Sequence, residues 1–118
     1  MKRDMDLFRL LLLKAEEQPF NGSLPQIEIP GHTAEELYYH VLLANDAGLV
    51  EATFCMGYEF FIDRLTQAGH EFLDAAREER FWNKAKETVL KNAGTLTVES
   101  LKIALSMLMQ QAARGMLA

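Results

Sequence analysis

The side chains whose types could support metal binding include three histidines, His32, His40 and His70, in a chain of 118 residues. Metal sites need several such ligands at fixed spacing, and the sequence contains neither a His-Glu-x-x-His nor a Cys-x-x-Cys pair. His32 and His40 flank a predicted helix without a third ligand at helical spacing, and His70 follows Gly69 at a predicted helix start. We therefore expect no metal, no cofactor and a structural role for each histidine.

Nucleophiles and acid–base pairs show no catalytic pattern either. The serines have no motif around them, the acidic residues are scattered, and the glycines never form a phosphate-binding loop. Cys55 is the single cysteine and lies between Phe54 and Met56, where we expect a small buried hydrophobic side chain in a strand. The sequence therefore predicts no catalytic residue and a protein that is not an enzyme.

The placement of charge is the most informative property of the sequence. Twelve Lys and Arg against seventeen Asp and Glu give a net charge of −5, and no basic residue lies between positions 15 and 63. That stretch carries nine acids, namely Glu16, Glu17, Glu28, Glu35, Glu36, Asp46, Glu51, Glu59 and Asp63. Because DNA-binding proteins neutralise phosphates with Lys and Arg, the stretch is unsuited to contact DNA. Its acids can dock onto a basic protein, imitate DNA, or remain a solvated face.

Periodicity and capping residues predict the elements that position these side chains. Up to residue 65 they are a helix over 4–17 capped by Asp4, an edge strand over 24–29, a helix over 33–46 capped by Thr33 and ended by Gly48, and strands over 49–55 and 59–65. Thr33 and Glu36 match a capping box, and residues 56–58 match a hairpin turn. Tyr38 and Tyr39 are neighbours on a helix, so one is expected to face the core and the other solvent.

The remainder of the chain is predicted to be helical. Thr66 caps a helix whose apolar stripe slips in phase across residues 77–80, which predicts a kink or break there. Trp82 lies where the stripe resumes and is expected in the core. Residues 92–94 end this segment, and Thr95 or Thr97 caps a last helix.

The last helix carries apolar residues on more than one side. One side is expected to pack on its own chain, and the other is expected to meet a second subunit in a homodimer. The predicted residues of this dimer helix are Leu101, Leu105, Leu108, Met109 and Met116.

The order of the elements predicts an α+β fold. We expect a winged-helix variant, with a helical core, a small three-stranded antiparallel sheet and a C-terminal helical extension. The helix over 33–46 takes the recognition position, and residues 49–65 form the wing. The variant is reduced, because a typical helix-turn-helix places two helices before the wing. We assign residues 1–76 to the winged-helix-like core and 77–118 to helices that pack on it, as one domain overall.

Four blocks of sequence carry a resemblance to a known group. They are MKRDMDL at 1–7, YHVLL at 39–43 with AGLV at 47–50, RLTQAGHEFLD at 64–74, and FWNKAK at 81–86. Together they resemble a family of small bacterial and phage proteins that is catalogued as a domain of unknown function and is often found in prophages. The resemblance implies a winged-helix-like fold and a mobile-element setting. It implies no functional residues, because the family carries no established activity.

Two hypotheses of function follow from the charge pattern and the expected fold. The first is a regulatory or anti-host adaptor that binds a protein through the acidic helix and the wing. Its candidate contacts are Glu35, Glu36, Tyr39, Asp46 and Tyr58. The alternative is a winged-helix transcriptional regulator whose candidate DNA contacts are His40, Asn45 and Arg64. Charge reversal on the acidic helix separates the two, because it should weaken protein docking and strengthen DNA binding.

The N-terminal residues predict a cytoplasmic protein. Lys2 and Arg3 resemble the start of a signal peptide, but Asp4, Asp6 and Arg9 interrupt the pattern. The apolar runs fall far short of the roughly 20 residues that a membrane span requires. A single cysteine excludes an internal disulfide and fits a reducing compartment. We therefore expect no membrane partner.

Overall fold

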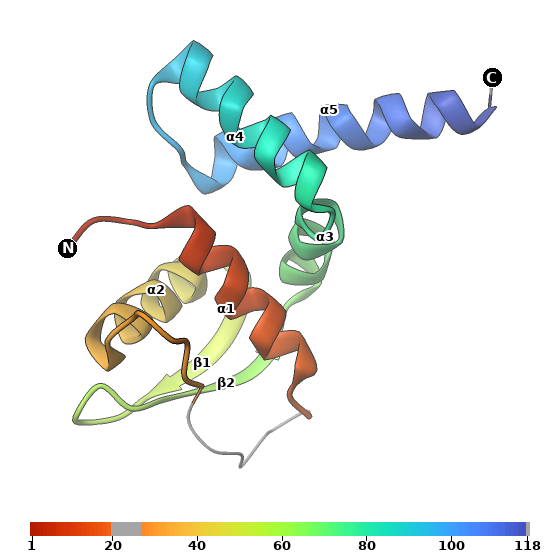
Figure 1. Ribbon diagram of the computed structural model, residues 1–118. Coiled ribbons are helices and arrows are strands. Elements are labelled where there is room, and N and C mark those ends of the chain that lie inside the picture. Colours follow the sequence, from red (N-terminus) through yellow and green to blue (C-terminus); the bar gives the residue numbers. More distant parts are fainter. Residues whose placement is uncertain (20–26, 118) are drawn as a thin grey trace. The chain divides into compact units, whose positions relative to one another are not determined.

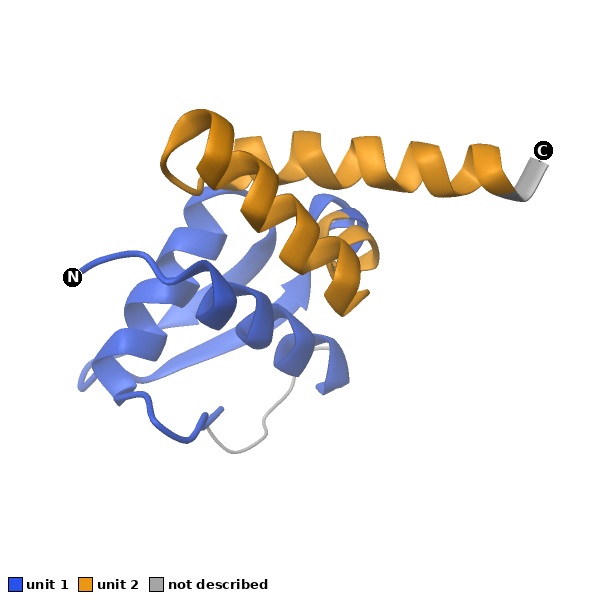
Figure 2. Cartoon of the chain, turned by 45° about the horizontal axis from the view of Figure 1, so that its top comes forward, with its two compact units in different colours: residues 1–71 blue, residues 72–118 orange. Residues whose placement is uncertain are grey.

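The computed structural model describes residues 1–19 and 27–117, with side chains placed up to residue 115. The chain divides into two compact units, residues 1–71 and 72–118, which Figure 2 colours separately. The division between the units falls inside the helix at 67–76. The elements in Figure 1 are α1 (Met5–Glu17), α2 (Ala34–Asp46), β1 (Val50–Phe54), β2 (Phe60–Leu65), α3 (Gln67–Ala76), α4 (Glu79–Ala93) and α5 (Val98–Leu117).

Unit 1 consists of two helices packed on one hairpin. α1 and α2 contact each other and both contact the hairpin, and Figure 1 shows them on the same face of β1 and β2. Its core contains Leu7, Phe8, Leu11 and Leu12 of α1, Leu37, Val41 and Ala44 of α2, and Val50, Phe60, Ile62 and Leu65 of the strands. These side chains recur at helical spacing in the helices and chiefly at alternate positions in the strands. The α+β class is therefore confirmed.

Both ends of α2 follow the chemistry expected from the sequence. Thr33 Oγ1 accepts a hydrogen bond from the Glu36 N–H, and the Glu36 side chain accepts one from the Thr33 N–H, so the capping box is complete. At the other end the Gly48 N–H donates to the Asn45 carbonyl and the Leu49 N–H donates to the Ala44 carbonyl. Gly48 has φ +75°, the left-handed conformation that such an end requires. The helix therefore begins and ends where predicted.

Replacing Thr33 by alanine should destabilise the protein by about 1 kcal/mol, because the Glu36 N–H loses its acceptor at the start of α2. Urea denaturation followed by circular dichroism measures this loss. Thr33→Ser is the matched control, since it keeps the hydroxyl and should retain most of the stability. Equal stability of the alanine and serine variants would contradict the role of the cap.

The sheet in the described part of the chain has two antiparallel strands rather than the predicted three. Phe54 pairs with Phe60 and Thr53 with Phe61, and an irregularity after Glu51 shifts the register by one residue. Residues 27–29 of the predicted edge strand are not in a strand, and residues 24–26 lie outside the described residues. Ile27 and Ile29 are buried, and Glu28 between them is exposed. The alternation of apolar and polar residues therefore predicted correctly which side chains are buried, but it did not show that these residues pair with a strand.

Unit 2 contains the end of α3 and the helices α4 and α5, which contact each other. The predicted break across residues 77–80 is observed between Ala76 and Glu79. Gly94 ends α4 in the left-handed conformation, and Thr97 caps α5 by accepting from the Ser100 N–H. Trp82 is buried in the core of this unit, as predicted. No helix in the described residues is long and apolar enough to span a bilayer.

Candidate functional site

The outer face of α2 brings together three of the predicted partner contacts. Glu35, Tyr39 and Asp46 are separated by four and by seven residues, which places them on one stripe of an α-helix. Glu35 and Asp46 are exposed and Tyr39 is half-buried, whereas Leu37, Val41 and Ala44 on the opposite face are buried in the core. Within residues 1–19 and 27–115 no ion pair involves Glu35 or Asp46. This stripe can therefore offer two carboxylates and an aromatic ring to a partner.

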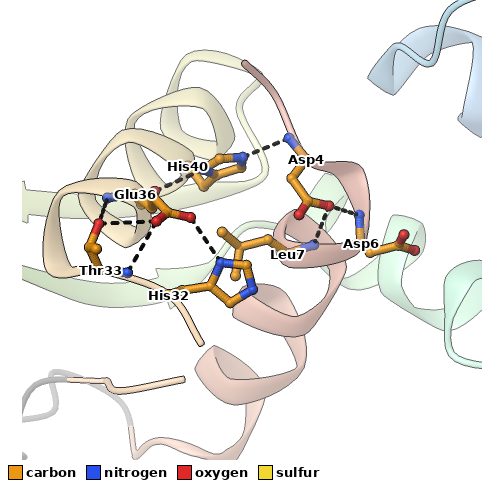
Figure 3. Close-up of polar contacts among 7 residues, drawn as sticks. All are labelled: Asp4, Asp6, Leu7, His32, Thr33, Glu36 and His40. Carbon is orange, nitrogen blue, oxygen red and sulfur yellow. Dashed lines mark hydrogen bonds and ion pairs between the residues drawn. The ribbon is translucent and has the colours of Figure 1, made fainter. Parts of the chain in front are cut away.

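Glu36 differs from its neighbour because its carboxylate is already bonded within the chain. One oxygen lies 3.0 Å from His32 Nδ1, and the other accepts from the Thr33 N–H and hydroxyl at 3.4 and 3.3 Å. Figure 3 shows these contacts around the start of α2. The hydrogen bond from His32, with those from Thr33, lowers the pKa of the Glu36 carboxyl below its ordinary value. Glu36 therefore has the structural role that the predicted capping box assigns to it, and the bond to His32 is an additional contact.

The lowered pKa of Glu36 has a consequence for the dependence of stability on pH. Because the folded pKa lies below the unfolded one, the contribution of Glu36 is present above the unfolded pKa and is lost as the pH falls through the folded pKa. In the His32→Ala variant the pKa of Glu36 should rise toward its ordinary value. A carboxyl titration by NMR measures this shift.

Glu51 is the internal control in the same titration, because Arg64 rather than a histidine lowers its pKa. The curve of Glu51 should be unchanged by His32→Ala. An unchanged curve for Glu36 in the variant would contradict the assigned cause of its shift.

The fifth predicted partner contact, Tyr58, lies in the hairpin turn and is 49% exposed. Its ring contacts the ring of Tyr38, which lies in the first half of α2 near Glu35. Both tyrosines of α2 are half-buried, so the expected division into one core and one solvent-facing ring is wrong. Cys55 was expected in the core and is instead exposed, because β1 ends at Phe54 and the cysteine belongs to the turn.

The alternative set of DNA contacts is already engaged inside unit 1. His40 is 2% exposed, and its Nδ1 and Nε2 lie 2.8 Å from the Glu36 carbonyl and the Asp4 N–H respectively, as Figure 3 shows. Asn45 Oδ1 accepts from the Ala52 N–H, and Arg64 forms a two-point ion pair with Glu51 at 2.7 and 3.1 Å. The prediction of His40 as a DNA contact is therefore wrong, because a buried ring cannot reach a groove, and its structural role is confirmed.

The predicted dimer helix also needs correction. Leu101 and Leu105 are fully buried in the chain itself, so they cannot be the side chains that meet a second subunit. Leu108 is half-buried and Met109 is exposed, and the side chain of Met116 lies outside the described residues. Ile103 and Met107 are exposed on the same helix and were missing from the predicted set. Apolar periodicity identified the helix but not which of its sides is covered.

Charge is distributed unevenly between the two units. Residues 1–71 contain five basic and twelve acidic residues, whereas residues 72–118 contain seven basic and five acidic ones. Of the nine acids between positions 15 and 63, only Glu36 and Asp63 are half-buried and the others are exposed. Seven of these nine acids therefore lie on the surface of unit 1. The described residues bring no three His, Cys, Asp or Glu side chains into an arrangement that could hold a metal ion.

Comparisons with known proteins give a family without an assigned activity. The family described as "Hypothetical protein (DUF2513)" matches residues 2–95. A protein of Haemophilus influenzae (strain ATCC 51907 / DSM 11121 / KW20 / Rd), described as "Uncharacterized protein", is 38% identical over 106 residues, which cover 86% of this chain and 90% of that protein. No solved structure matches the chain significantly.

Proposed function

Because the chain belongs to the DUF2513 family, whose description names no activity, we propose a function from the surface of the chain itself. The protein acts without catalysis, as an adaptor that binds a basic protein. Its docking surface consists of Glu35, Tyr39 and Asp46 on α2 and Tyr58 in the hairpin turn. The observation that carries the proposal is that seven of the nine acids between positions 15 and 63 are exposed, in a stretch of sequence that contains no Lys or Arg.

Electrostatics favour a basic partner over nucleic acid at this surface. Carboxylates that face a basic surface speed the encounter and fix its register, whereas carboxylates that face phosphate repel it. Tyr39 adds an aromatic ring between the two carboxylates, and tyrosine is among the residues that contribute most to protein interfaces. The surface thus combines charge for steering with an apolar group for affinity.

We also propose that the fold is a reduced winged helix in a mobile-element protein with a regulatory or anti-host role. Support for the fold comes from the order of the elements, in which α2 is followed by the Gly48 turn, the β1–β2 hairpin and α3. Support for the setting comes from the four sequence blocks that resemble prophage proteins. In this arrangement α2 occupies the position that other winged helices use for DNA, but it presents acids there.

A homodimer through α5 is a further part of the proposal. Ile103 and Met107 are exposed and lie one turn apart on the same side of α5, and no charged residue lies between positions 103 and 113. Two copies of this side of the helix can therefore approach without repulsion between like charges. Light scattering after size-exclusion chromatography should give twice the mass of the chain. The Met107→Glu variant should be monomeric, and a monomeric parent protein would refute the dimer.

The docking surface is tested by the double variant Glu35→Lys with Asp46→Lys, which leaves the cap residue Glu36 intact. Reversal at Glu35 is unfavourable at the start of a helix and reversal at Asp46 is favourable at the end, so the effects on α2 largely cancel. Glu79→Lys with Glu87→Lys changes net charge equally on α4 and is the matched control. Proteins captured from a bacterial lysate by the parent chain should be lost with the first pair and retained with the control.

A DNA titration decides between the proposal and the alternative regulator. Fluorescence anisotropy of random and promoter duplexes should show no binding by the parent chain, even at low salt. Binding that weakens steeply with salt would make the DNA-binding regulator the better description, because it would reveal phosphate contacts. Equal capture of the same lysate proteins by both charge-reversed pairs would refute the docking surface itself.

A further inference from the structure

Three aromatic rings gather at the tip of the hairpin. The centroid of Tyr38 lies 5.2 Å from that of Phe54 and 5.7 Å from that of Tyr58, with interplanar angles of 72° and 70°. Rings inclined this steeply meet edge to face, so each pair covers a face of only one of its two rings, whereas a stack covers a face of both. The three rings line one open hollow with residues 55–57 of the turn.

The turn keeps its apolar side chains in solvent at a cost in backbone conformation. Tyr58 has φ +59°, a left-handed conformation that bulky residues rarely adopt. Met56, two residues earlier, is 94% exposed. A glycine or asparagine at position 58 would form the turn with less strain, but it would remove the ring that faces Tyr38. Strain of this kind is a reason to look for a function at the site.

Two glutamates close in sequence to the rings indicate what the hollow would bind. Glu35 lies one helical turn before Tyr38, Glu59 follows Tyr58, and both glutamates are exposed. Aromatic faces attract cations, and carboxylates accept hydrogen bonds from them. A guanidinium group satisfies both, because it is planar, stacks on rings and donates several N–H bonds in its own plane. An open hollow also suits a flat group better than a compact one.

We propose that the hollow formed by Tyr38, Phe54 and Tyr58 binds an arginine side chain of the protein partner. The inference rests on the proposed function, because it names the group through which a basic partner would engage the hairpin end of the docking surface. Arginine would lie over the tyrosine rings, with Glu35 or Glu59 pairing with its guanidinium.

An NMR titration of the full chain tests this site with two short peptides, one of alternating arginine and serine and one of alternating lysine and serine. The arginine peptide should bind more tightly and should shift the Met56 methyl signal and the amide signals of residues 54–59. Tyr58→Leu keeps an apolar side chain but removes the ring, and it should weaken the arginine peptide about two- to fivefold. Unchanged amide signals elsewhere show that the variant is folded.

Two further variants are controls, one that keeps the ring at position 58 and one that removes a ring outside the hollow. Tyr58→Phe keeps the ring and should bind as the parent does. Phe61→Leu removes a partly exposed ring of β2 that does not line the hollow, and it should also leave affinity unchanged. Equal affinity for both peptides with no effect of Tyr58→Leu, or no shift at residues 54–59, would overturn the arginine site.

The charge-reversed pair on α2 separates this failure from that of the proposed function. If Glu35→Lys with Asp46→Lys abolishes capture of lysate proteins while Tyr58→Leu leaves peptide binding unchanged, the acidic docking surface stands and the arginine site is refuted. If the peptide binds as expected and capture survives the charge reversal, the arginine site stands and the wider docking surface is refuted.

Discussion

Replacing Trp82 by alanine should lower the free energy of unfolding by about 3–5 kcal/mol. Trp82 is 2% exposed, lies edge-on to Phe72 with centroids 6.3 Å apart, and has Lys86 Nζ 5.9 Å from its ring centroid. Alanine leaves a cavity that the helices around it can close only partly. Because domains of this size have a total stability of about 5–15 kcal/mol, the loss would consume a large share of it.

Urea denaturation followed by far-ultraviolet circular dichroism measures this effect, since the chain has one tryptophan and the variant lacks its fluorescence. Trp82→Phe is the matched control and should lose less, because it keeps a ring against Phe72. Lys86→Gln removes only the cation near the ring and should cost roughly 0.5–1 kcal/mol. A Trp82→Ala loss as small as that of Lys86→Gln would show that the ring is not a core residue of unit 2.

Replacing Gly69 by alanine should also destabilise the protein, by about 2 kcal/mol net. A Cβ at this position would overlap the carbonyl oxygen of Leu49, which accepts the Thr66 N–H at 3.0 Å. Thr66 Oγ1 also donates to the Gly48 carbonyl, so the segment at 48–49 is held on two sides and cannot easily move away. Overpacking of this kind costs about 1–3 kcal/mol or more, which exceeds the gain of up to about 1 kcal/mol that alanine brings to a helix.

Gly115→Ala is the matched control for this substitution. Gly115 lies in α5 with no atom near its would-be Cβ, so alanine there should be neutral or stabilising by up to about 1 kcal/mol. Thermal unfolding of the two variants gives opposite expected signs. Stabilisation by Gly69→Ala would show that α3 and the residues before β1 do not approach as closely as described.

Local signals predicted most of the elements because the residues that determine them are adjacent in the sequence. Thr33 with Glu36, the Gly48 turn and the phase slip after Ala76 each act within a few residues. Hydrophobic spacing likewise identified Trp82 as a core residue. These features need no knowledge of the tertiary structure, and they were correct.

The errors concern contacts between distant segments. His40 looks like a polar residue on an exposed helix, but its partner at Asp4 is 36 residues away and no local pattern announces it. Apolar spacing likewise marks Ile27 and Ile29 as buried without showing whether they pair in a sheet. Leu101 and Leu105 were correctly predicted to lie on one apolar stripe of α5. The prediction that a second subunit covers them was wrong, because their own chain buries them. The cluster of Tyr38 with Phe54 and Tyr58 was also not predicted. Two adjacent tyrosines in the sequence indicated that one ring is accessible, but only the position of the hairpin shows that Tyr38 contacts the other two rings.

The hydrogen bond between Asp4 and His40 also has a kinetic consequence. Since Nε2 accepts from the Asp4 N–H, the ring proton is on Nδ1 and donates to the Glu36 carbonyl, so one neutral ring joins two backbone groups. The Asp4 amide precedes α1 and would otherwise exchange its hydrogen with water at the rate of an open chain. Its protection instead reports how often the contact between the residue that caps α1 and His40 of α2 opens.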